Sequence, residues 1–486
     1  MESNKELLLS FISRQITTVP VQVEEKTYIN SEKLNYRENF YNLKKYIDDF
    51  LSGNIHNRFI TMPGLRGVGK STLLFQLYDY LLNEKNIAKE RILYLSTDLL
   101  KSFLDEDIYN AVEVFINEIH LKTPITLDEE VFIFIDEAQS DEKWSQVGKV
   151  LHDLSNKIFM IFTGSSALDF EINVNAVRRT KKETVYPLNF QEYLLLKYGL
   201  RYGLSCEKGM SKALKEVIST GNIDNALKIE NNTFIKYFDL KNPLKYEWEN
   251  YLCFGGFPNS IYLKESDIFE TTNEMIDKII EKDVSHYRSF QNSTKNVISN
   301  IITFLALQKP GEISEGNLAN RLDVSPSLVK EILRILEKTH LIFSVKPYAA
   351  AGKTVRTSWK YYFLSPTLKS ALSYNLGKYK PKERDFLGIL AENLVASTFF
   401  KLKNTSNIIN GIFYSNDKNS ADFLLNKSIG DIIPVEVGIG NKNKKQVLKS
   451  MNKHDGDYGI VISSRTERIR KEDDIIFIPL TTFSFI

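Results

Sequence analysis

Residues 64–71 read GLRGVGKS, a phosphate-binding loop of the form G-x-x-x-x-G-K-S. Its glycines let the backbone curl so that successive N–H groups point at phosphate oxygens. Lys70 is placed to reach the β- and γ-phosphates, and the Ser71 hydroxyl is placed to bind Mg²⁺. A buried strand is predicted at 59–62, and apolar spacing predicts an amphipathic helix over 71–82. We therefore expect the phosphates at a helix N-terminus.

Two adjacent carboxylates follow a second apolar run. Residues 131–135 read VFIFI, which is typical of a central parallel strand covered on both faces. Asp136 and Glu137 come next, at the carboxyl end of the strand, where open α/β sheets bind ligands. Asp136 is expected to hold Mg²⁺ and Glu137 to polarise an attacking water as general base. Glu137 points to hydrolysis rather than binding alone; the alternative is a solvated carboxylate.

A third apolar run supplies hydroxyl groups at the same predicted edge. Residues 157–162 lead into Thr163, Gly164, Ser165 and Ser166, where a hydroxyl could bond the water or the γ-phosphate. A plain loop is the alternative for this turn. The expected nucleotide-binding set is Gly64, Arg66, Gly67, Val68, Gly69, Lys70, Ser71, Thr72, Asp136, Thr163 and Ser165.

Length and composition limit the class of protein. A chain of 486 residues is too long for one core and suggests three or four domains. The charges nearly cancel, 63 basic against 61 acidic, so net charge forces no polyanionic partner. Cys206 and Cys253 are too few for a disulfide framework or a cysteine zinc site, and they fit a reducing cytosol. No signal peptide or membrane-spanning run is evident, so we expect a cytoplasmic protein without membrane contact.

The chain alternates strand and helix patterns around the loop. Strands are predicted at 58–62, 91–96, 131–135, 157–163 and 184–188, the βαβ rhythm of a parallel sheet. The pattern is then helical to about residue 290, broken by Gly255 and Gly256. Farther on, strands are predicted at 411–414, 421–425, 432–437, 458–463 and 474–478, with a helix near 444–452.

Several stretches together resemble a known family. They are GLRGVGKSTLL, FIFIDEAQ, FTGSS, VYPLNFQEYL, YLCFGGFP at 251–258 and GILAENLVASTFF at 388–400. The family is that of AAA+-like prokaryotic ATPases with a C-terminal winged helix and a restriction-endonuclease-like domain. The resemblance implies an α/β fold whose sensor strand lies between the P-loop strand and the acid strand. It also implies ATP and Mg²⁺ as ligands. The expected parts are an N-terminal segment (1–38), a P-loop ATPase domain (39–195), a helical lid (196–289), a winged helix (290–375) and a restriction-endonuclease-like domain (376–486).

Arg179 matches in spacing an arginine that the family carries before its Leu-Asn-Phe-type motif. The family's preceding glycine is absent here, since the stretch reads NAVRR over 175–179. A guanidinium suits a γ-phosphate because it stays protonated and donates a fork of hydrogen bonds. We read Arg179, with Arg178 as substitute, as a nucleotide-sensing or finger arginine; the alternative is a solvated basic loop.

Residues 316–345 read as a helix-turn-helix. Ser325 is a good N-cap and Pro326 suits the first helical position. Lys330, Arg334 and Lys338 fall four apart on one polar stripe, which could meet DNA phosphates or bases. A predicted wing over 343–362 adds Lys346, Lys353, Arg356 and Lys360. Glu331 and Glu337 dilute the stripe, and a protein-binding module is the alternative.

The tail resembles a restriction-endonuclease-like metal site. Glu392, Asp422 and Glu436 occupy the family's acidic positions, and Asp422 with Glu436 would bind the metal. Gly438 stands where the family's lysine should stabilise charge at the phosphate, which puts cleavage in doubt. Lys442, Lys444 or Lys445 are the substitutes in reach.

Three functions remain open from the sequence. In the first, ATP hydrolysis drives a change in a winged-helix and degenerate nuclease-like tail that acts on DNA. In the second, the chain is an ATP-regulated, metal-dependent nuclease of the defence type, which Gly438 disfavours. In the third, it is a nucleotide-switch scaffold for a partner protein, which Glu137 disfavours. Assembly into a homo-oligomer is a further expectation, because a finger arginine can act across a subunit boundary.

Overall fold

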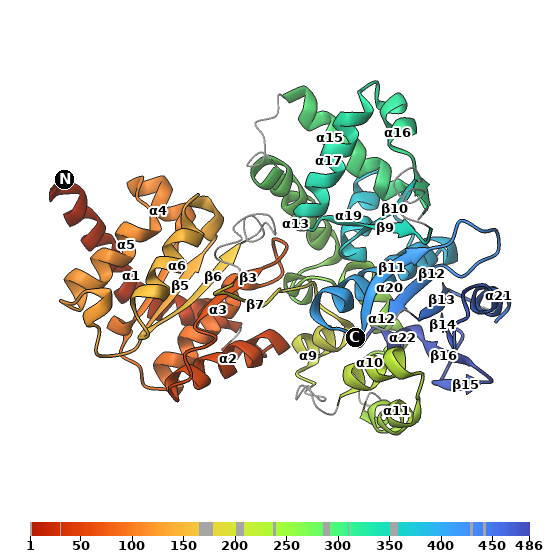
Figure 1. Cartoon of the computed structure of the whole chain (residues 1–486), viewed down its shortest axis with the longest axis horizontal. Helices are drawn as coiled ribbons and strands as arrows, with labels where there is room; N and C mark the ends of the chain where they lie inside the picture. The colour runs from red at the N-terminus through yellow and green to blue at the C-terminus, as the bar shows by residue number, and fades with distance from the viewer. Residues whose placement is uncertain are drawn as a thin grey trace. The chain divides into compact units, whose positions relative to one another are not determined.

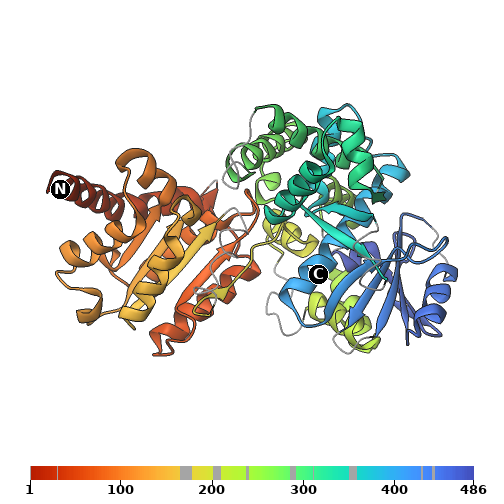
Figure 2. The same cartoon turned by 45° about the horizontal axis from the view of Figure 1, so that its top comes forward.

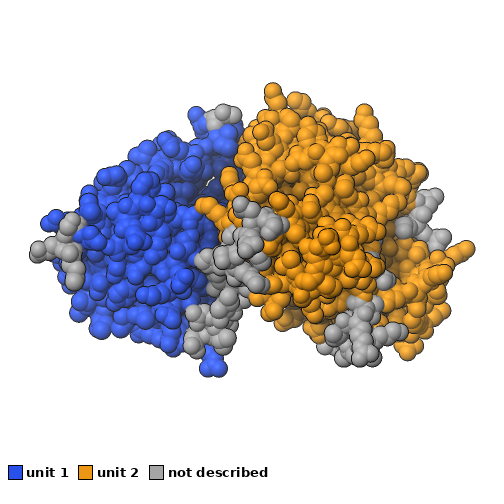
Figure 3. All heavy atoms as spheres, turned by 90° about the horizontal axis from the view of Figure 1, so that it is seen from above, with its two compact units in different colours: residues 1–186 blue, residues 187–486 orange. Residues whose placement is uncertain are grey.

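The computed structural model describes residues 2–29, 31–164, 178–200, 209–236, 240–284, 292–309, 311–349, 358–427, 431–440 and 444–486. The chain divides into two compact units, residues 1–186 and residues 187–486, which Figure 3 shows in different colours. Each unit has its own sheet, so each is considered by itself.

The first unit alternates helices and strands (Figure 1). Its elements are α1 (Glu2–Thr27), β1 (Tyr28–Ile29), β2 (Glu32–Lys33), α2 (Glu38–Leu51), β3 (Phe59–Pro63), α3 (Lys70–Asp79), η1 (Tyr80–Glu84), η2 (Lys89–Arg91), β4 (Ile92–Ser96), α4 (Thr97–Leu104), α5 (Ile108–Val114), η3 (Phe115–Ile119), η4 (Pro124–Thr126), β5 (Val131–Asp136), η5 (Ala138–Ser140), α6 (Trp144–Leu154), β6 (Ile158–Gly164) and β7 (Lys181–Lys182).

Among the described residues of this unit, β1 and β2 form a small antiparallel sheet, and five parallel strands form the larger sheet, in the order β4-β5-β6-β3-β7. The strand that ends at Thr163 and Gly164, β6, lies between the P-loop strand β3 and the acid strand β5. This confirms the strand order that the family resemblance implies. Pro63 pairs with Gly164 and Ser96 with Asp136, so the carboxyl ends of these strands meet at one edge of the sheet.

Helices cover both faces of this sheet (Figure 2). On β5, Ile133 and Ile135 belong to a core that also includes side chains of α1, α5 and α6. On the other face, the rings of Phe132 and Phe159 lie 5.8 and 5.4 Å from that of Phe50 in α2. Burial on both faces explains why VFIFI is continuously apolar rather than alternating.

The N-terminal segment, for which no role was predicted, is largely the helix α1. Its buried apolar residues recur three or four apart, as in any amphipathic helix: Leu8, Ile12, Ile16, Val19 and Val23. Pro20 lies inside this helix, although the spacing of the buried residues continues past it. The strand predicted at 184–188 is also wrong, since Val185 makes only an isolated bridge to Gly64 and the paired strand is β7.

The second unit begins with helices and ends with a mixed sheet. Its elements are α9 (Phe190–Tyr198), α10 (Met210–Thr220), α11 (Asp224–Lys236), α12 (Leu244–Phe254), η6 (Pro258–Ile261), α13 (Glu265–Lys278), η7 (Ile279–Val284), α15 (Asn292–Leu307), β8 (Glu312–Ile313), α16 (Glu315–Leu322), α17 (Pro326–Lys338), β9 (Ile342–Pro347), β10 (Trp359–Phe363), α19 (Pro366–Asn375), α20 (Arg384–Thr405), β11 (Ile409–Tyr414), β12 (Phe423–Lys427), β13 (Ile432–Gly438), α21 (Lys445–His454), β14 (Gly459–Ser463), β15 (Arg470–Glu472), β16 (Ile475–Pro479) and α22 (Leu480–Phe483).

In the described parts of this unit, nine strands form one sheet, in the order β15-β16-β14-β13-β12-β11-β9-β10-β8. The hairpin β9–β10 pairs antiparallel, with Tyr362 opposite Phe343. Its strand β9 also pairs in parallel with β11, where Phe413 lies beside Lys346. The sheet therefore continues across the domain boundary that we predicted at residues 375 and 376.

Candidate functional site

The phosphate-binding loop has the backbone that its glycines predict. Gly67 and Gly69 have φ angles of 77° and 95°, a region that strains side-chain-bearing residues. A Cβ atom on Gly64 would lie 2.4 Å from the carbonyl oxygen of Val185, so no larger residue fits there. α3 begins at Lys70, immediately after the loop. The loop thus ends at a helix N-terminus, as expected for an anion site.

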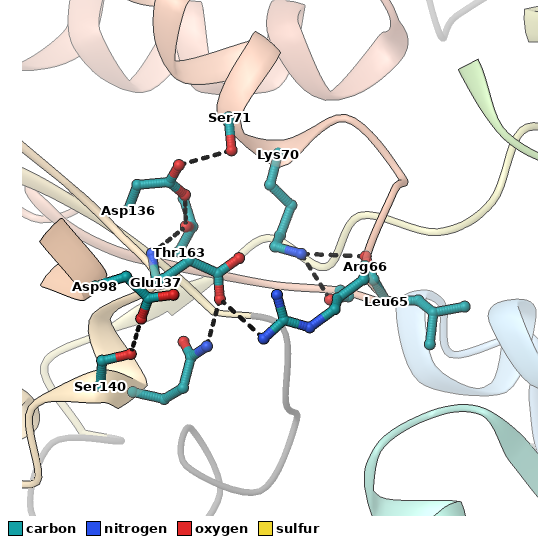
Figure 4. A network of polar contacts seen from close by, with 11 residues as sticks. Leu65, Arg66, Lys70, Ser71, Asp98, Asp136, Glu137, Ser140 and Thr163 are labelled. Carbon is teal, nitrogen blue, oxygen red and sulfur yellow. Dashed lines mark hydrogen bonds and ion pairs between the residues drawn. The ribbon is translucent and has the colours of Figure 1, made fainter. Parts of the chain in front are cut away.

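Lys70 folds back over its own loop. Its Nζ donates hydrogen bonds to the carbonyl oxygens of Gly64 (2.8 Å) and Leu65 (3.1 Å), and the residue is buried (Figure 4). These two loop carbonyl groups thus hold the ammonium beside the loop. An anion entering the loop would meet a cation that is already in place.

Asp136 collects three hydroxyl groups. The Ser71 hydroxyl donates to Oδ2 at 2.6 Å, the Thr163 hydroxyl donates to Oδ1 at 2.5 Å, and the Tyr94 hydroxyl donates to Oδ2 at 3.1 Å (Figure 4). Burial raises the pKa of the Asp136 carboxyl, the charge of Glu137 adds to this rise, and the bonds from Ser71 and Thr163 oppose it. The predicted partners Ser71 and Thr163 therefore meet, together with Tyr94, around one buried carboxylate.

Glu137 is held by backbone and side-chain contacts. Its φ of 52° is unusual for a residue other than glycine, and its N–H donates to the Thr163 hydroxyl at 3.2 Å. Its Oε2 accepts a short hydrogen bond from the Gln139 amide and lies 3.9 Å from Nη2 of Arg66. The left-handed backbone turns the carboxylate toward the loop rather than along the strand (Figure 4).

Two supporting residues were missed in the sequence. Tyr94 lies on β4, 42 positions from Asp136, and Arg37 lies just before α2. The Arg37 guanidinium is buried and donates to the carbonyl oxygens of Val68 (2.6 Å) and Tyr186 (2.9 Å). Nothing in the local pattern distinguishes either residue, because only the tertiary fold brings them to the loop.

The residues present fit a nucleotide with Mg²⁺. Ser71 and Asp136 bring hydroxyl and carboxylate oxygens to one point, and such hard oxygen ligands suit Mg²⁺. Thr72 follows in the first turn of α3, and Val68 is fully buried beneath the loop. Ser165 lies outside the described residues. Among the described residues, no group of three or more His, Cys, Asp or Glu side chains could hold a metal.

Arg179 is not brought to the phosphate loop of its own chain. Its Nε donates to Oδ1 of Asp153 at 2.7 Å, and Asp153 lies near the end of α6, which leads into the amino end of β6. Lys181 lies beside Ile60, early in β3. Arg179 therefore lies near the amino ends of the strands, whereas the loop lies at their carboxyl ends.

The predicted tail carboxylates lie on neighbouring elements. Phe423 pairs with Val435 in two antiparallel strands. Asp422 directly precedes Phe423 and Glu436 directly follows Val435, so the two acids lie side by side, and Glu436 is fully buried. Asp422 Oδ2 accepts from the Val437 N–H at 2.8 Å. Glu392 on α20 accepts from the Tyr362 hydroxyl at 2.8 Å. The metal-binding role of this pair stays a prediction.

Lys444 does not take the place of the family's lysine, whose position is occupied here by Gly438. Gly438 ends β13, and the Lys444 ammonium is 3.0 Å from Asp473. Lys445 begins α21, and Lys442 lies outside the described residues. Of the three predicted substitutes, Lys444 is therefore paired with Asp473.

The predicted basic stripe lies on α17. The Ser325 side chain caps this helix by accepting from the Leu328 N–H at 3.3 Å. Lys330 and Arg334 are exposed, and Lys338 is half-buried. Glu337 accepts from the Ser344 N–H at 2.9 Å, so it is turned toward β9.

The strand lysines of the predicted wing lie on aromatic rings. The Lys346 ammonium lies over Trp359 and that of Lys360 over Tyr414, at 4.6 and 5.0 Å from the ring centres. Lys353 and Arg356 lie outside the described residues. No helix in the described parts of the chain has the length and apolar character needed to cross a membrane.

Comparisons with known proteins match both units. Residues 56–194 match an AAA domain, and residues 245–379 and 387–483 match domains of unknown function, DUF8612 and DUF4143. The chain is 31% identical over 444 residues to the uncharacterized protein MJ1637 of Methanocaldococcus jannaschii, covering 91% of this chain and 87% of that protein. It is 26% identical over 408 residues to MJ1544 of the same organism, covering 82% and 79%.

Two solved structures are also similar to this chain, at low sequence identity. The Aeropyrum pernix ORC1 protein in complex with DNA is 10% identical with a TM-score of 0.33, over 72% of this chain and 96% of that one. C. elegans PCH-2 is 15% identical with a TM-score of 0.27, over 64% and 73%.

Proposed function

The chain belongs to the family of AAA+-like ATPases that join an AAA domain to a C-terminal DUF4143 domain, and we propose that it binds ATP with Mg²⁺ and hydrolyses it. The observation that carries this proposal is the buried Asp136 carboxylate. It accepts hydrogen bonds from the hydroxyl groups of Ser71 and Thr163, and Glu137 is the next residue in the chain. Binding-only loops need the first acid but have no use for the second.

Each residue of the network has a separate task in this proposal. Lys70 and the loop N–H groups bind the β- and γ-phosphates, and Ser71 with Asp136 would hold Mg²⁺. The ion, when bound, neutralises phosphate charge. Glu137 accepts a proton from the attacking water, which general-base catalysis requires within hydrogen-bond reach. Thr163 bonds both Asp136 and the Glu137 N–H, so it fixes the two acids relative to each other.

We further propose that the nucleotide state reaches the second unit through residues 185–188. Arg37 bonds the loop at Val68 and the chain at Tyr186. Two residues later, the Leu188 N–H donates to Gly256 at 2.9 Å, and its carbonyl accepts from the Tyr251 hydroxyl at 3.0 Å. In this proposal, a shift of the loop at Val68 is passed to Tyr186 through Arg37 and then along the chain to Leu188.

The second unit supplies the proposed output. The helices α16 and α17 with β9 and β10 are proposed as a winged helix that meets DNA through Lys330 and Arg334. The tail is proposed as a nuclease-like domain that binds DNA without cutting it. The reason is that Gly438 supplies no positive charge at the position where the family has a lysine. Active cleavage and a hydrolysis-free scaffold for a partner protein are the competing functions.

One experiment separates the three functions. The protein is incubated with Mg²⁺, ATP and mixed DNA forms, and phosphate release and DNA length are followed together. We expect phosphate release without shortening of DNA. Shortening that disappears in Asp422→Ala would instead establish the nuclease, and ATP binding without release would establish the scaffold.

Two variants assign the hydrolysis to this site. Lys70→Ala should abolish tight ATP binding because it removes the cation beside the phosphates. Glu137→Gln should retain binding and lose turnover by about 10²–10⁴-fold, because an amide accepts no proton. Turnover by Glu137→Gln equal to that of the unmodified protein would contradict the assignment.

A further inference from the structure

Arg66 is the second cation of the phosphate loop. Its Nη2 lies 3.9 Å from Glu137 Oε2, and only 18% of its side chain is exposed. Gln139 donates to the same carboxylate oxygen. In Figure 4, the guanidinium of Arg66 and the ammonium of Lys70 lie on either side of the space in front of Glu137. Each of these two cations therefore contacts a protein acceptor close to the expected phosphate position.

The position of Arg66 relates it to the terminal phosphate. A general base must lie within one water of the phosphorus that the water attacks. A cation that contacts Glu137 is consequently on the γ-phosphate side of the loop. At 3.9 Å the pair is longer than a charge-assisted hydrogen bond, so the carboxylate holds the guanidinium only weakly.

A phosphate is the better partner for this side chain. The guanidinium fork matches the geometry of phosphate oxygens and donates two parallel hydrogen bonds to them. When such a bond replaces the contact with Glu137, the carboxylate keeps its bond from Gln139 and becomes available to accept a proton. A diphosphate has no oxygen at this position, so it leaves the pair as it is.

We propose that Arg66 distinguishes a nucleoside triphosphate from a diphosphate by exchanging Glu137 for the γ-phosphate. The inference rests on the proposed function, since it requires ATP in this loop. It adds to that function a residue that recognises the γ-phosphate. The same movement of Arg66 binds the γ-phosphate and makes Glu137 available as the general base.

The test compares two nucleotides on the full-length protein. Dissociation constants of the non-hydrolysable analogue AMP-PNP and of ADP, both with Mg²⁺, are measured for the unmodified protein and for Arg66→Gln. We expect AMP-PNP to bind about tenfold more weakly to the variant, the loss of one charge-assisted bond, and ADP to change by less than about twofold. Arg66→Lys should fall between, because it keeps the charge but not the fork.

Arg91→Gln is the matched control. The Arg91 side chain is 20% exposed and pairs with Glu130 at 3.1 Å, but it precedes β4 at the opposite end of the strand from the loop. Its variant should leave both dissociation constants unchanged. Should Arg66→Gln melt well below this control, Arg66→Lys carries the comparison.

The failures of the two proposals are distinguishable. Equal weakening of AMP-PNP and ADP by the Arg66 variants, or no weakening of either, would overturn the reader role while leaving ATP binding intact. An unmodified protein that binds neither nucleotide would overturn the proposed function itself.

Discussion

The ionised form of Asp136 lowers the stability of the fold but is required for the proposed activity. Burial raises the pKa of its carboxyl, with a further rise from the charge of Glu137. Folding therefore favours the protonated form, and keeping the group ionised costs stability at every pH above its unfolded pKa of about 4. Hydrolysis nevertheless needs the ionised form, because only a carboxylate binds Mg²⁺ well.

Asp136→Asn should consequently stabilise the nucleotide-free protein and abolish its turnover. At pH 8 we expect a melting temperature about 2–4 °C above that of the unmodified protein, since the neutral amide avoids the buried charge. The difference should shrink as the pH falls toward 4, where Asp136 takes up its own proton. Thermal unfolding from pH 4 to 8 measures this; a variant that melts at or below the unmodified protein at pH 8 would contradict the account.

Sequence spacing predicted the polar centre of the site but not its supports. The loop, Asp136 and Thr163 were found because each ends or follows an apolar strand, and parallel strands bring such ends together. Arg37 and Tyr94 were missed because they act through distant contacts, to Val68 and Asp136, that leave no local pattern. The role of Arg66 depends on the 3.9 Å approach to Glu137, which only the folded loop reveals.

At the scale of elements, the paired glycines after α12 form a packed junction. A Cβ atom on Gly255 would lie 2.6 Å from the Cα of Tyr251, and one on Gly256 would lie 2.2 Å from the Ser365 hydroxyl. The Gly256 N–H also donates to the Thr367 hydroxyl at 3.0 Å. The sequence predicted only that these glycines interrupt a helix, whereas the structure shows that they let three segments meet.

Gly255→Ala should therefore destabilise the second unit by about 1–3 kcal/mol, because the backbone of Tyr251 cannot yield to the methyl group. Gly388→Ala is the matched control: it lies within α20 and a Cβ atom there meets nothing within 4 Å. Alanine should leave stability there unchanged or raise it by about 0.5–1 kcal/mol. Urea unfolding midpoints give both values, and equal midpoints for the two variants would refute the steric argument.

Elements with strong periodicity were predicted well, and weak ones were not. Strands β3, β5, β6, β13, β14 and β16 fall within one or two residues of their predicted ranges. The helix α1 was missed because its mean composition is polar and Pro20 falls inside it, although its buried residues keep a helical spacing. β7 is only two residues long, so no alternation marks it.

At the scale of the whole molecule, the structure divides the chain into two compact units, residues 1–186 and 187–486, and the five predicted parts stay a prediction. The family resemblance separates the hairpin β9–β10, as part of the expected winged helix, from the tail. Their union in one sheet depends on the pairing of β9 with β11, which follows from tertiary placement and not from local pattern. The finer division remains a prediction for the second unit.

The position of Arg179 bears on the proposed assembly of several subunits. Because it lies at the edge of the sheet opposite the loop, any contact with a γ-phosphate must be with the nucleotide of a neighbouring subunit. Its ion pair with Asp153 is partly exposed, and such pairs are weak enough to exchange for a phosphate. A head-to-tail assembly of subunits would supply one such arginine to each site.

This placement predicts that turnover per subunit rises with protein concentration and falls in Arg179→Ala. Equal amounts of Arg179→Ala and Lys70→Ala subunits should recover about a quarter of full activity, because one interface in four joins an intact loop to an intact arginine. Lys182→Ala, an exposed change in the same segment, should behave as the unmodified protein. Undiminished hydrolysis by Arg179→Ala alone would remove the finger role, and mixtures that stay inactive would show that the arginine acts without crossing between subunits.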